Sequence, residues 1–448
     1  MAKSCLRGKV ITANFIWTGN TFENGIQMRI DQNGFISEIG KNLFKGSEEL
    51  FDFGQKALIP GFVNSHSHAF HRYMRGRSHI GSSYKDSFWK WREDMYSVVE
   101  HIDEKMLYEC THATFTEMLS AGITTVGEFH YLHHGKKRFS LDQIILNAAQ
   151  DAGIRIVLIN TLYCNAGFDG SPLTEAQKKF ISSVNEFIEN IELLQQRTKQ
   201  LQTIAVAAFA FYRMLFYFVK QVTGFIIAHS LRAVSVEDIS ILSKWCQKTG
   251  RPMHIHLEEQ QKEIEDCRKI YGCDPSELLL QNISHYVNIT AVHCTHTTTN
   301  LMQLLAQNAI NICICPLTEG YLGDGIPNIV DEAHICLGTD CNNRICMLEE
   351  MRWLTYCQHM LHHTRNACGL DARKLLCIAT ENGAKSLGIE NLVGRFSQGM
   401  QFDFVAFDLC SPRLGQQFDD LLDAIVFGGG NGDIALTGVS GMIVFSRN

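Results

Sequence analysis

Eight short apolar segments recur along the chain, and their spacing constrains the fold more than any other feature. They are rich in β-branched residues, are separated by polar stretches long enough to hold a helix, and cover residues 62–65, 123–129, 155–161, 225–229, 253–257, 289–294, 310–315 and 335–339. Strands that are apolar on both faces are typical of parallel sheets covered by helices. With 45% hydrophobic residues, a chain of 448 can bury a large core. We therefore predict an α/β protein built on a (β/α)8 barrel.

The two ends of the chain have a different pattern. Residues 9–53 have the alternation of short strands joined by Asn-Gly turns, and residues 402–408 and 441–446 alternate in the same way. We predict that both ends pair into one small β-sandwich. The expected boundaries are residues 1–58 for its first part, 59–390 for the barrel and 391–448 for its second part.

The charge composition is ordinary and excludes few classes of function. The chain has 40 Lys and Arg against 47 Asp and Glu, a net charge of −7 that argues against nonspecific nucleic-acid binding. The 16 cysteines are scattered without a CxxC pair, and no secretory leader precedes them. We therefore expect reduced, mostly buried thiols in a cytoplasmic protein that does not bind membranes.

Two histidines stand two residues apart where the first predicted barrel strand ends. Pro60 and Gly61 interrupt the preceding structure, and His66 and His68 close the segment that follows. Residues i and i+2 of a strand share a face, so both imidazoles can reach one metal ion. Barrel enzymes keep their chemistry at this end of the strands. The pair alone is a weak signal, because nearby histidines are more often ordinary polar residues.

Three later predicted strands carry similar residues at the same end. His254 and His256 lie in the fifth strand, His293 ends the sixth, and Asp340 follows the eighth. Each has a structural alternative: His254 as a buried strand residue, His293 as a hydrogen-bonded core histidine and Asp340 as a helix N-cap. Taken together they favour a metal site, because histidine nitrogens plus a carboxylate suit zinc and leave room for a catalytic water.

Longer motifs surround these residues. They include Asn64-Ser-His66-Ser-His68-Ala-Phe70, Asp86-Ser-Phe-Trp-Lys-Trp-Arg92-Glu93, Glu128-Phe-His130-Tyr131-Leu-His133-His134, His229-Ser-Leu-Arg232-Ala-Val, His254-Ile-His256-Leu-Glu-Glu259-Gln-Gln-Lys262-Glu, Thr318-Glu319-Gly-Tyr-Leu-Gly323-Asp324-Gly325 and Glu349-Glu350-Met-Arg352-Trp353-Leu. The H-x-H signature resembles the amidohydrolase superfamily in general. The Trp-Arg-Glu, Phe-His-Tyr, Ser-Leu-Arg and Glu-Gln-Gln-Lys-Glu blocks resemble its formimidoylglutamate deiminase family, which acts in histidine degradation.

This resemblance implies a metal and a reaction, the hydrolysis of N-formimidoyl-L-glutamate to N-formyl-L-glutamate and ammonia. The implied ligands of a single zinc ion per chain are His66, His68, His256 and Asp340. Asp340 would also accept a proton from the attacking water, His293 would stabilise charge on the tetrahedral intermediate, and Glu259 would pass protons to the departing ammonia. Glu258 is the rival carboxylate, and it would point to the other side if the strand continued that far.

Formimidoylglutamate carries two carboxylates, so its binding requires cationic side chains. Arg92 and Arg232 are the candidates, because a guanidinium group offers a planar fork that binds a carboxylate at two points. By the resemblance, Tyr131 and His229 also belong to the substrate site. His71 belongs there too, although it stands where the family is expected to have glutamine.

Two segments depart from the family pattern. Residues 205–227 are dense in apolar side chains, but Arg213 and Lys220 argue against a membrane span. We expect there an insertion that forms a buried or partner-facing helix, followed by the fourth strand, and that disturbs the Arg232 loop. Cys341-Asn342-Asn343-Arg344 replaces a serine- and histidine-rich turn, so Arg344 is expected to add a charge near the metal.

Two other classes of function remain open at this stage. One is another zinc deaminase or hydrolase of the superfamily, acting on a purine, pyrimidine or triazine, which would not need Arg92 and Arg232 for a dicarboxylate. The other is a catalytically silent relative, which only the departures named above support. A homodimer is expected, because many barrel hydrolases of this type form dimers.

Overall fold

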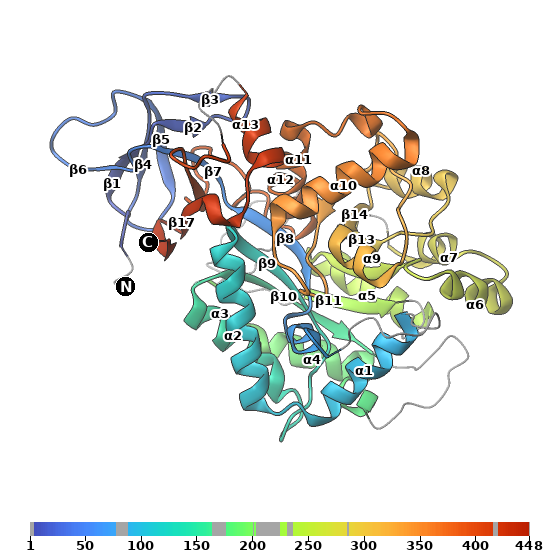
Figure 1. Ribbon diagram of the computed structural model, residues 1–448. Coiled ribbons are helices and arrows are strands. Elements are labelled where there is room, and N and C mark those ends of the chain that lie inside the picture. Colours follow the sequence, from blue (N-terminus) through green and yellow to red (C-terminus); the bar gives the residue numbers. More distant parts are fainter. Residues whose placement is uncertain are drawn as a thin grey trace.

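An eight-stranded parallel barrel forms the centre of the computed structural model (Figure 1). The structure describes residues 4–77, 88–163, 176–199, 201–202, 225–230, 236–284, 286–414 and 420–447, and only the backbone of residues 89, 176, 225–230 and 236. The barrel strands are β8 (Phe62–Ser67), β9 (Ile123–His130), β10 (Arg155–Leu162), β11 (Phe225–Ser230), β12 (Met253–Leu257), β13 (Ile289–His293), β14 (Asn311–Ile314) and β15 (His334–Leu337). Each predicted segment contributes one strand, so the predicted barrel is confirmed.

The barrel closes between its first and last strands. The backbone N–H groups of Thr339 and Asp340 each donate to the carbonyl oxygen of His66 at 3.0 Å, and the N–H of His68 donates to the carbonyl of Asp340 at 2.9 Å. The Asn64 side chain adds two bonds to Thr339, one donated to its hydroxyl at 2.7 Å and one accepted from its backbone N–H at 3.0 Å. Residues from the two ends of the barrel sequence therefore meet at one point.

Helices surround the barrel and follow its strands (Figure 1). They are α1 (Phe88–His101), α2 (Glu104–Ser120), α3 (Ser140–Ala152), α4 (Val184–Gln195), α5 (Val236–Thr249), α6 (Gln261–Tyr271), α7 (Pro275–Asn282), α8 (Thr299–Gln307), α9 (Pro316–Leu322), α10 (Met347–His362), α11 (Ala372–Ile378), α12 (Glu381–Ser386) and α13 (Leu421–Asp423), with short turns η1 (Ala69–Met74), η2 (Ala176–Lys179), η3 (Ala367–Gly369), η4 (Ala424–Gly428) and η5 (Asn431–Asp433). Asp103 and Ser183 cap the N-termini of α2 and α4 by accepting backbone N–H bonds. Gly272 ends α6 with φ of 73°, which glycine adopts without strain.

A second layer of two sheets lies at one side of the barrel, and the N- and C-terminal parts of the chain meet in it (Figure 1). The sheet orders are β5-β4-β1-β6 and β18-β17-β16-β7-β2-β3. Their strands are β1 (Lys9–Thr12), β2 (Phe15–Trp17), β3 (Phe22–Glu23), β4 (Ile26–Ile30), β5 (Ile36–Lys41), β6 (Glu49–Asp52), β7 (Lys56–Pro60), β16 (Phe404–Asp408), β17 (Ile434–Val439) and β18 (Met442–Ser446). The pairing of β7 with β16 confirms the predicted union of both chain ends, whereas β17 was missed from the sequence.

The chain passes from the second layer to the barrel at Gly61. This residue lies between β7 and β8, and a Cβ atom placed on it would lie 2.2 Å from the Oγ1 atom of Thr124. No other residue fits without moving the neighbouring strand, so the close approach explains why glycine stands here.

One buried ion pair joins the barrel to the second layer. Arg155, at the start of β10, donates from Nε and Nη2 to the two carboxylate oxygens of Asp403 at 3.0 and 2.9 Å. Both side chains are 2% exposed, and Asp403 also accepts the backbone N–H of Ser440 at 2.7 Å. The pair therefore fixes the start of a barrel strand against the loop that leads into β16.

Replacing Arg155 by methionine should destabilise the protein by about 3–5 kcal/mol, because it leaves the Asp403 carboxylate buried without its cation. Chemical denaturation monitored by circular dichroism measures the change. The double variant Arg155→Met/Asp403→Leu should recover most of the loss. Lys262→Met serves as the control, because it removes only the exposed pair with Asp266 and should cost less than about 1 kcal/mol. Equal effects of the two single variants would contradict the assigned role.

The structure also bears on the expectations for the cysteines, for membrane-spanning helices and for the apolar segment 205–227. The cysteines in the described part of the chain are free, and most of them are buried. No helix among the described residues is long and apolar enough to cross a membrane. Of the apolar segment 205–227, residues 205–224 lie outside the described residues, and the remainder begins β11 as predicted.

Candidate active site

Four side chains converge at the carboxyl end of the barrel strands. His66 lies in β8 and His68 directly follows it, His256 lies in β12, and Asp340 follows β15. One ligand atom from each lies within 4.8 Å of those of the other three, and all four residues are buried. The structure therefore brings together the four residues that the sequence predicts as metal ligands.

The chemistry of these atoms fits a cation. The Nδ1 atom of His68 lies 2.8 Å from the carbonyl oxygen of Phe129, so Nδ1 carries the proton and Nε2 presents a lone pair. This lone pair and the Nε2 of His66 both lie 3.3 Å from Oδ1 of Asp340. Burial holds the pKa of His68 and of His256 well below the usual value, so both rings are neutral at pH 7. The lone pair of His68 is repelled by a carboxylate this close unless a cation lies between them, and a donor set of three histidines and one aspartate suits zinc.

A carboxyl group beneath the ligands was not assigned a role from the sequence. Glu128 in β9 accepts the hydroxyl of Ser67 at 2.8 Å and the backbone N–H of Ala69 at 2.7 Å. Burial outweighs these bonds and raises the pKa of Glu128 to about 8. The residues it holds flank His68, so Glu128 fixes the backbone that presents this ligand. Its sequence signals are an acidic residue within a buried strand and its place at the start of the motif that continues to His134.

Asn342, in the loop after β15, supports the metal ligands in a similar way at the point where β8 and β15 close the barrel. Its amide lies 3.0 Å from both the hydroxyl of Ser67 and the carbonyl of His68, and its side-chain oxygen accepts the hydroxyl of Thr339 at 2.7 Å. It therefore cross-links the two loops that carry ligands.

The prediction that Arg344 adds charge near the metal is wrong: this side chain is 61% exposed and pairs with Glu349. The chain has left the buried turn by that point and is about to enter α10.

His293 ends β13 beside the ligand cluster. Its ring stacks on that of His256 with centroids 5.3 Å apart, its Nε2 lies 3.7 Å from Glu259, and its Nδ1 lies 3.4 Å from Glu319. Burial alone would lower the pKa of His293, but the carboxylates of Glu259, Glu319 and Asp340 outweigh it and raise this pKa to about 10. These carboxylates favour the protonated form of the ring, which faces the cavity and suits stabilisation of developing negative charge.

The two neighbouring glutamates after β12 point in different directions. Glu259 lies beside His293 and lines the cavity. Glu258 has a left-handed φ of 52° and turns away, accepting the backbone N–H of Ser276 at 2.8 Å and the hydroxyl of Thr297. The geometry thus favours Glu259 for proton transfer and gives Glu258 a loop-holding role, and the assignment itself awaits mutagenesis.

A cavity of about 50 Å³ connects the ligand cluster with three predicted substrate residues. Its walls include Arg92, Tyr131 and His71. The Nε of Arg92 donates to the hydroxyl of Tyr96 at 2.9 Å, and the Tyr131 hydroxyl lies 2.8 Å from Nε2 of His71. Burial lowers the pKa of His71 to about 4, so this ring is neutral. Arg232 lies outside the described residues, as does the side chain of His229, although the backbone of His229 belongs to β11.

The amidohydrolase family model matches residues 57–444, which is nearly the whole chain. The chain belongs to the amidohydrolase family. This family is metal-dependent, and the cluster of three histidines and one aspartate is its candidate metal site. Family membership also makes the protein a hydrolase that acts on carbon–nitrogen bonds.

Individual relatives agree with this membership. The chain is 32% identical over 433 residues to the formimidoylglutamate deiminase of Pseudomonas aeruginosa, covering 93% of this chain and 90% of that protein. It is 25% identical over 408 residues to a 5-methylthioadenosine/S-adenosylhomocysteine deaminase of Acetivibrio thermocellus, covering 90% and 84%. A solved amidohydrolase from Brucella melitensis matches with a TM-score of 0.83 and 28% identity, covering 98% of this chain and 96% of that one.

Proposed function

We propose that the protein is a zinc-dependent deiminase that hydrolyses N-formimidoyl-L-glutamate to N-formyl-L-glutamate and ammonia, a reaction of histidine degradation. The observation that carries this proposal is the guanidinium group of Arg92 in the same cavity as the metal ligands. We propose that this guanidinium binds a carboxylate of the substrate, because carboxylate and guanidinium match in charge and geometry. The 32% identity to the Pseudomonas deiminase supports the same substrate.

The residues divide the reaction between them. A zinc ion held by His66, His68, His256 and Asp340 would lower the pKa of a water, so that hydroxide would be available near neutral pH. Asp340 accepts the proton of the attacking water, and His293 stabilises the tetrahedral intermediate that forms at the amidine carbon. Glu259 passes protons to the amidine nitrogen, the hydroxyl of the intermediate loses its proton as the formyl C=O bond forms, and the C–N bond breaks to release ammonia, so that both protons of the water end on the nitrogen.

The orientation of the substrate is part of the proposal. The reacting amidine end lies beside the ligand cluster and the glutamate part lies toward Arg92, which lines the same cavity. Arg232 is proposed for the second carboxylate, on the basis of the Ser-Leu-Arg motif. Tyr131 and His71 form a hydrogen-bonded pair in the wall and are proposed to contact the substrate between these positions.

Ammonia release from a panel of substrates tests the proposal. Formimidoylglutamate, guanine, cytosine and 5-methylthioadenosine are each incubated with the zinc-loaded protein. We expect turnover of formimidoylglutamate alone. Turnover of a neutral heterocycle without turnover of formimidoylglutamate would move the protein to another deaminase class. Zinc binding without any turnover would favour the catalytically silent relative.

Replacing Arg92 by methionine should lower kcat/KM for formimidoylglutamate by about ten- to more than a hundredfold, because one charge-assisted contact contributes about 1.5–3 kcal/mol. Steady-state kinetics measures the change. A substrate analogue without the contacted carboxylate should lose far less. Lys90→Met is the control, because it removes an exposed cation from the same helix, where it pairs with Asp94. Equal losses for the substrate and for every monocarboxylate analogue would remove Arg92 from the recognition site.

A further inference from the structure

His293 has an unusual backbone conformation. His293 has φ of 77°, a left-handed value that non-glycine residues rarely adopt, so the strand direction alone does not set the orientation of its side chain. The imidazole is 1% exposed and has one carboxylate near each nitrogen, Glu259 near Nε2 and Glu319 near Nδ1. The mechanism above uses Glu259 and leaves Glu319 without a role.

Glu319 is itself held rigidly. It lies in α9, is 2% exposed, and its Oε1 accepts the backbone N–H of Cys315 at 2.9 Å. The helix is fixed in turn by Glu350 of α10, which accepts the backbone N–H of Leu317 at 2.9 Å. Both carboxyl groups are buried, but only Glu319 reaches the active site, so the two form a natural comparison.

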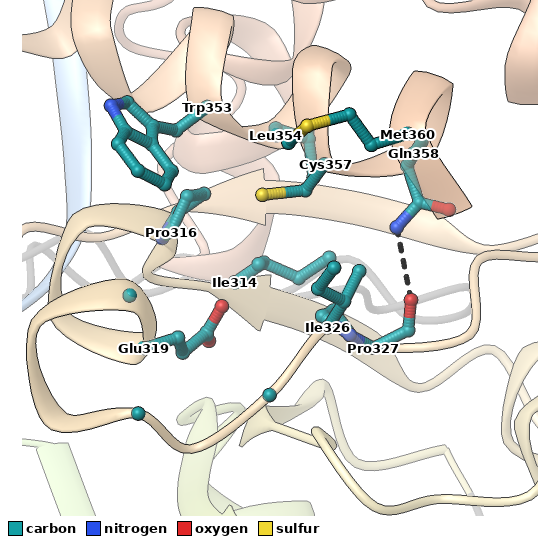
Figure 2. Close-up of a pocket in the computed structure, with 13 residues that line it drawn as sticks. Ile314, Pro316, Glu319, Ile326, Pro327, Trp353, Leu354, Cys357, Gln358 and Met360 are labelled. Carbon is teal, nitrogen blue, oxygen red and sulfur yellow. Dashed lines mark hydrogen bonds between the residues drawn. The ribbon is translucent and has the colours of Figure 1, made fainter. Parts of the chain in front are cut away.

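Beyond Glu319 there is space on the outer side of the barrel. A cavity of about 280 Å³ lies between α9 with its following loop and α10. Figure 2 shows the Glu319 side chain at one end of this cavity, opposite α10 with Trp353 and Cys357. The carboxylate thus stands between the outer cavity and His293, and shortening its side chain would enlarge this space.

Glu319 holds a proton on the Nδ1 atom of His293. Its Oε1 accepts from Cys315 and lies 3.4 Å from Nδ1, and an ionised carboxylate oxygen can only accept a hydrogen bond from the ring. Nδ1 must therefore carry a proton, and Nε2 is the nitrogen directed at Glu259 and the reacting centre. The same logic applies to buried carboxylates that orient histidines in metal and triad sites.

We propose that Glu319 is a positioning residue, which fixes the orientation and the Nδ1 proton of His293 for the reaction. The inference rests on the proposed role of His293 in hydrolysis. It does not depend on the identity of the substrate, because any substrate attacked beside the ligand cluster meets the same nitrogen.

Two substitutions of similar volume distinguish whether the reaction needs the hydrogen-bond acceptor of Glu319 or its negative charge. Glu319→Gln keeps an oxygen that accepts from Cys315 and His293, whereas Glu319→Met fills the space without an acceptor. We expect the methionine variant to lower kcat by about 10- to 100-fold with KM nearly unchanged, and glutamine to restore most of the rate. Zinc content should match wild type in both. Measurements use whichever panel substrate wild type turns over, so failure of the proposed substrate is seen separately.

Glu350→Gln is the matched control. It alters a buried carboxyl group that contacts α9 but not His293, so it should lower the unfolding midpoint and leave kcat within a few-fold of wild type. Wild-type kcat in Glu319→Met, or equal losses in the methionine and glutamine variants, would overturn the proposal. Nitrogen-15 NMR of labelled histidines in the wild-type holoenzyme gives a second test that needs no variant: His293 protonated on Nε2 alone would also overturn it.

Discussion

Replacing His256 by alanine is expected to abolish both zinc binding and turnover. His256 supplies one of three imidazoles around Asp340, and its Nε2 lies 3.1 Å from that of His66. Two histidines and a carboxylate would remain, and because this site is arranged for four protein ligands, losing one of them should weaken zinc binding steeply. Elemental analysis should therefore fall from one zinc per chain to a small fraction, with hydrolysis below detection. Chelation of wild type should have the same effect, and added zinc should reverse it.

His254→Gln is the control for this experiment, because it changes a buried histidine two residues earlier on the same strand. The Nε2 of His254 lies 3.0 Å from the carbonyl oxygen of Ser386, away from the ligand cluster, and a glutamine amide can donate the same bond. We expect full zinc occupancy and near-normal turnover in this variant. Full occupancy in His256→Ala, or metal loss in His254→Gln alone, would show that the ligand assignment is wrong.

Replacing Glu259 by glutamine should lower kcat by about 10²–10⁴-fold, the usual contribution of a general acid or base. Glu259 lines the cavity beside His293 but is not among the four clustered ligands, so zinc content should stay at the wild-type level. Pre-steady-state and steady-state ammonia release would locate the loss in the chemical step. The amide keeps the shape of the side chain and removes its negative charge and its ability to exchange a proton.

Glu258→Gln provides the comparison, because the two carboxylates are adjacent in sequence and opposite in direction. Glu258 accepts bonds from Ser276 and Thr297, so its loss should destabilise the protein by about 1–3 kcal/mol with a modest change in kcat. If Glu258→Gln loses turnover while Glu259→Gln keeps near-normal turnover, the roles of the two residues must be exchanged.

Much of the fold could be predicted from local patterns. Segments such as 123–129 and 155–161 are apolar on both faces, and only strands buried between a core and covering helices need that composition. The β17 strand was missed because it lies in the second layer, where short alternating segments resemble loops.

The candidate ligands were predictable for a related reason. In a parallel barrel all strands end at the same rim, so His66, His68, His256 and Asp340 must lie near one another once each is placed at a strand end. The spacing of histidines two residues apart adds that both face the same side. The direction of the strands grouped these residues together with His293, and the family resemblance selected the four ligands among them.

The tertiary structure alone decided which neighbouring side chains enter the site. A left-handed turn at Glu258 directs it away and leaves Glu259 beside His293, and a strand period cannot foresee such a turn. Arg344 was expected near the metal but emerges at the surface, because the buried turn before it ends at Asn342. The sequence determined the strands, their order and the residue types at the rim. Side-chain direction there depends on contacts between residues far apart in the chain, such as Glu319 with His293, and only the folded structure contains them.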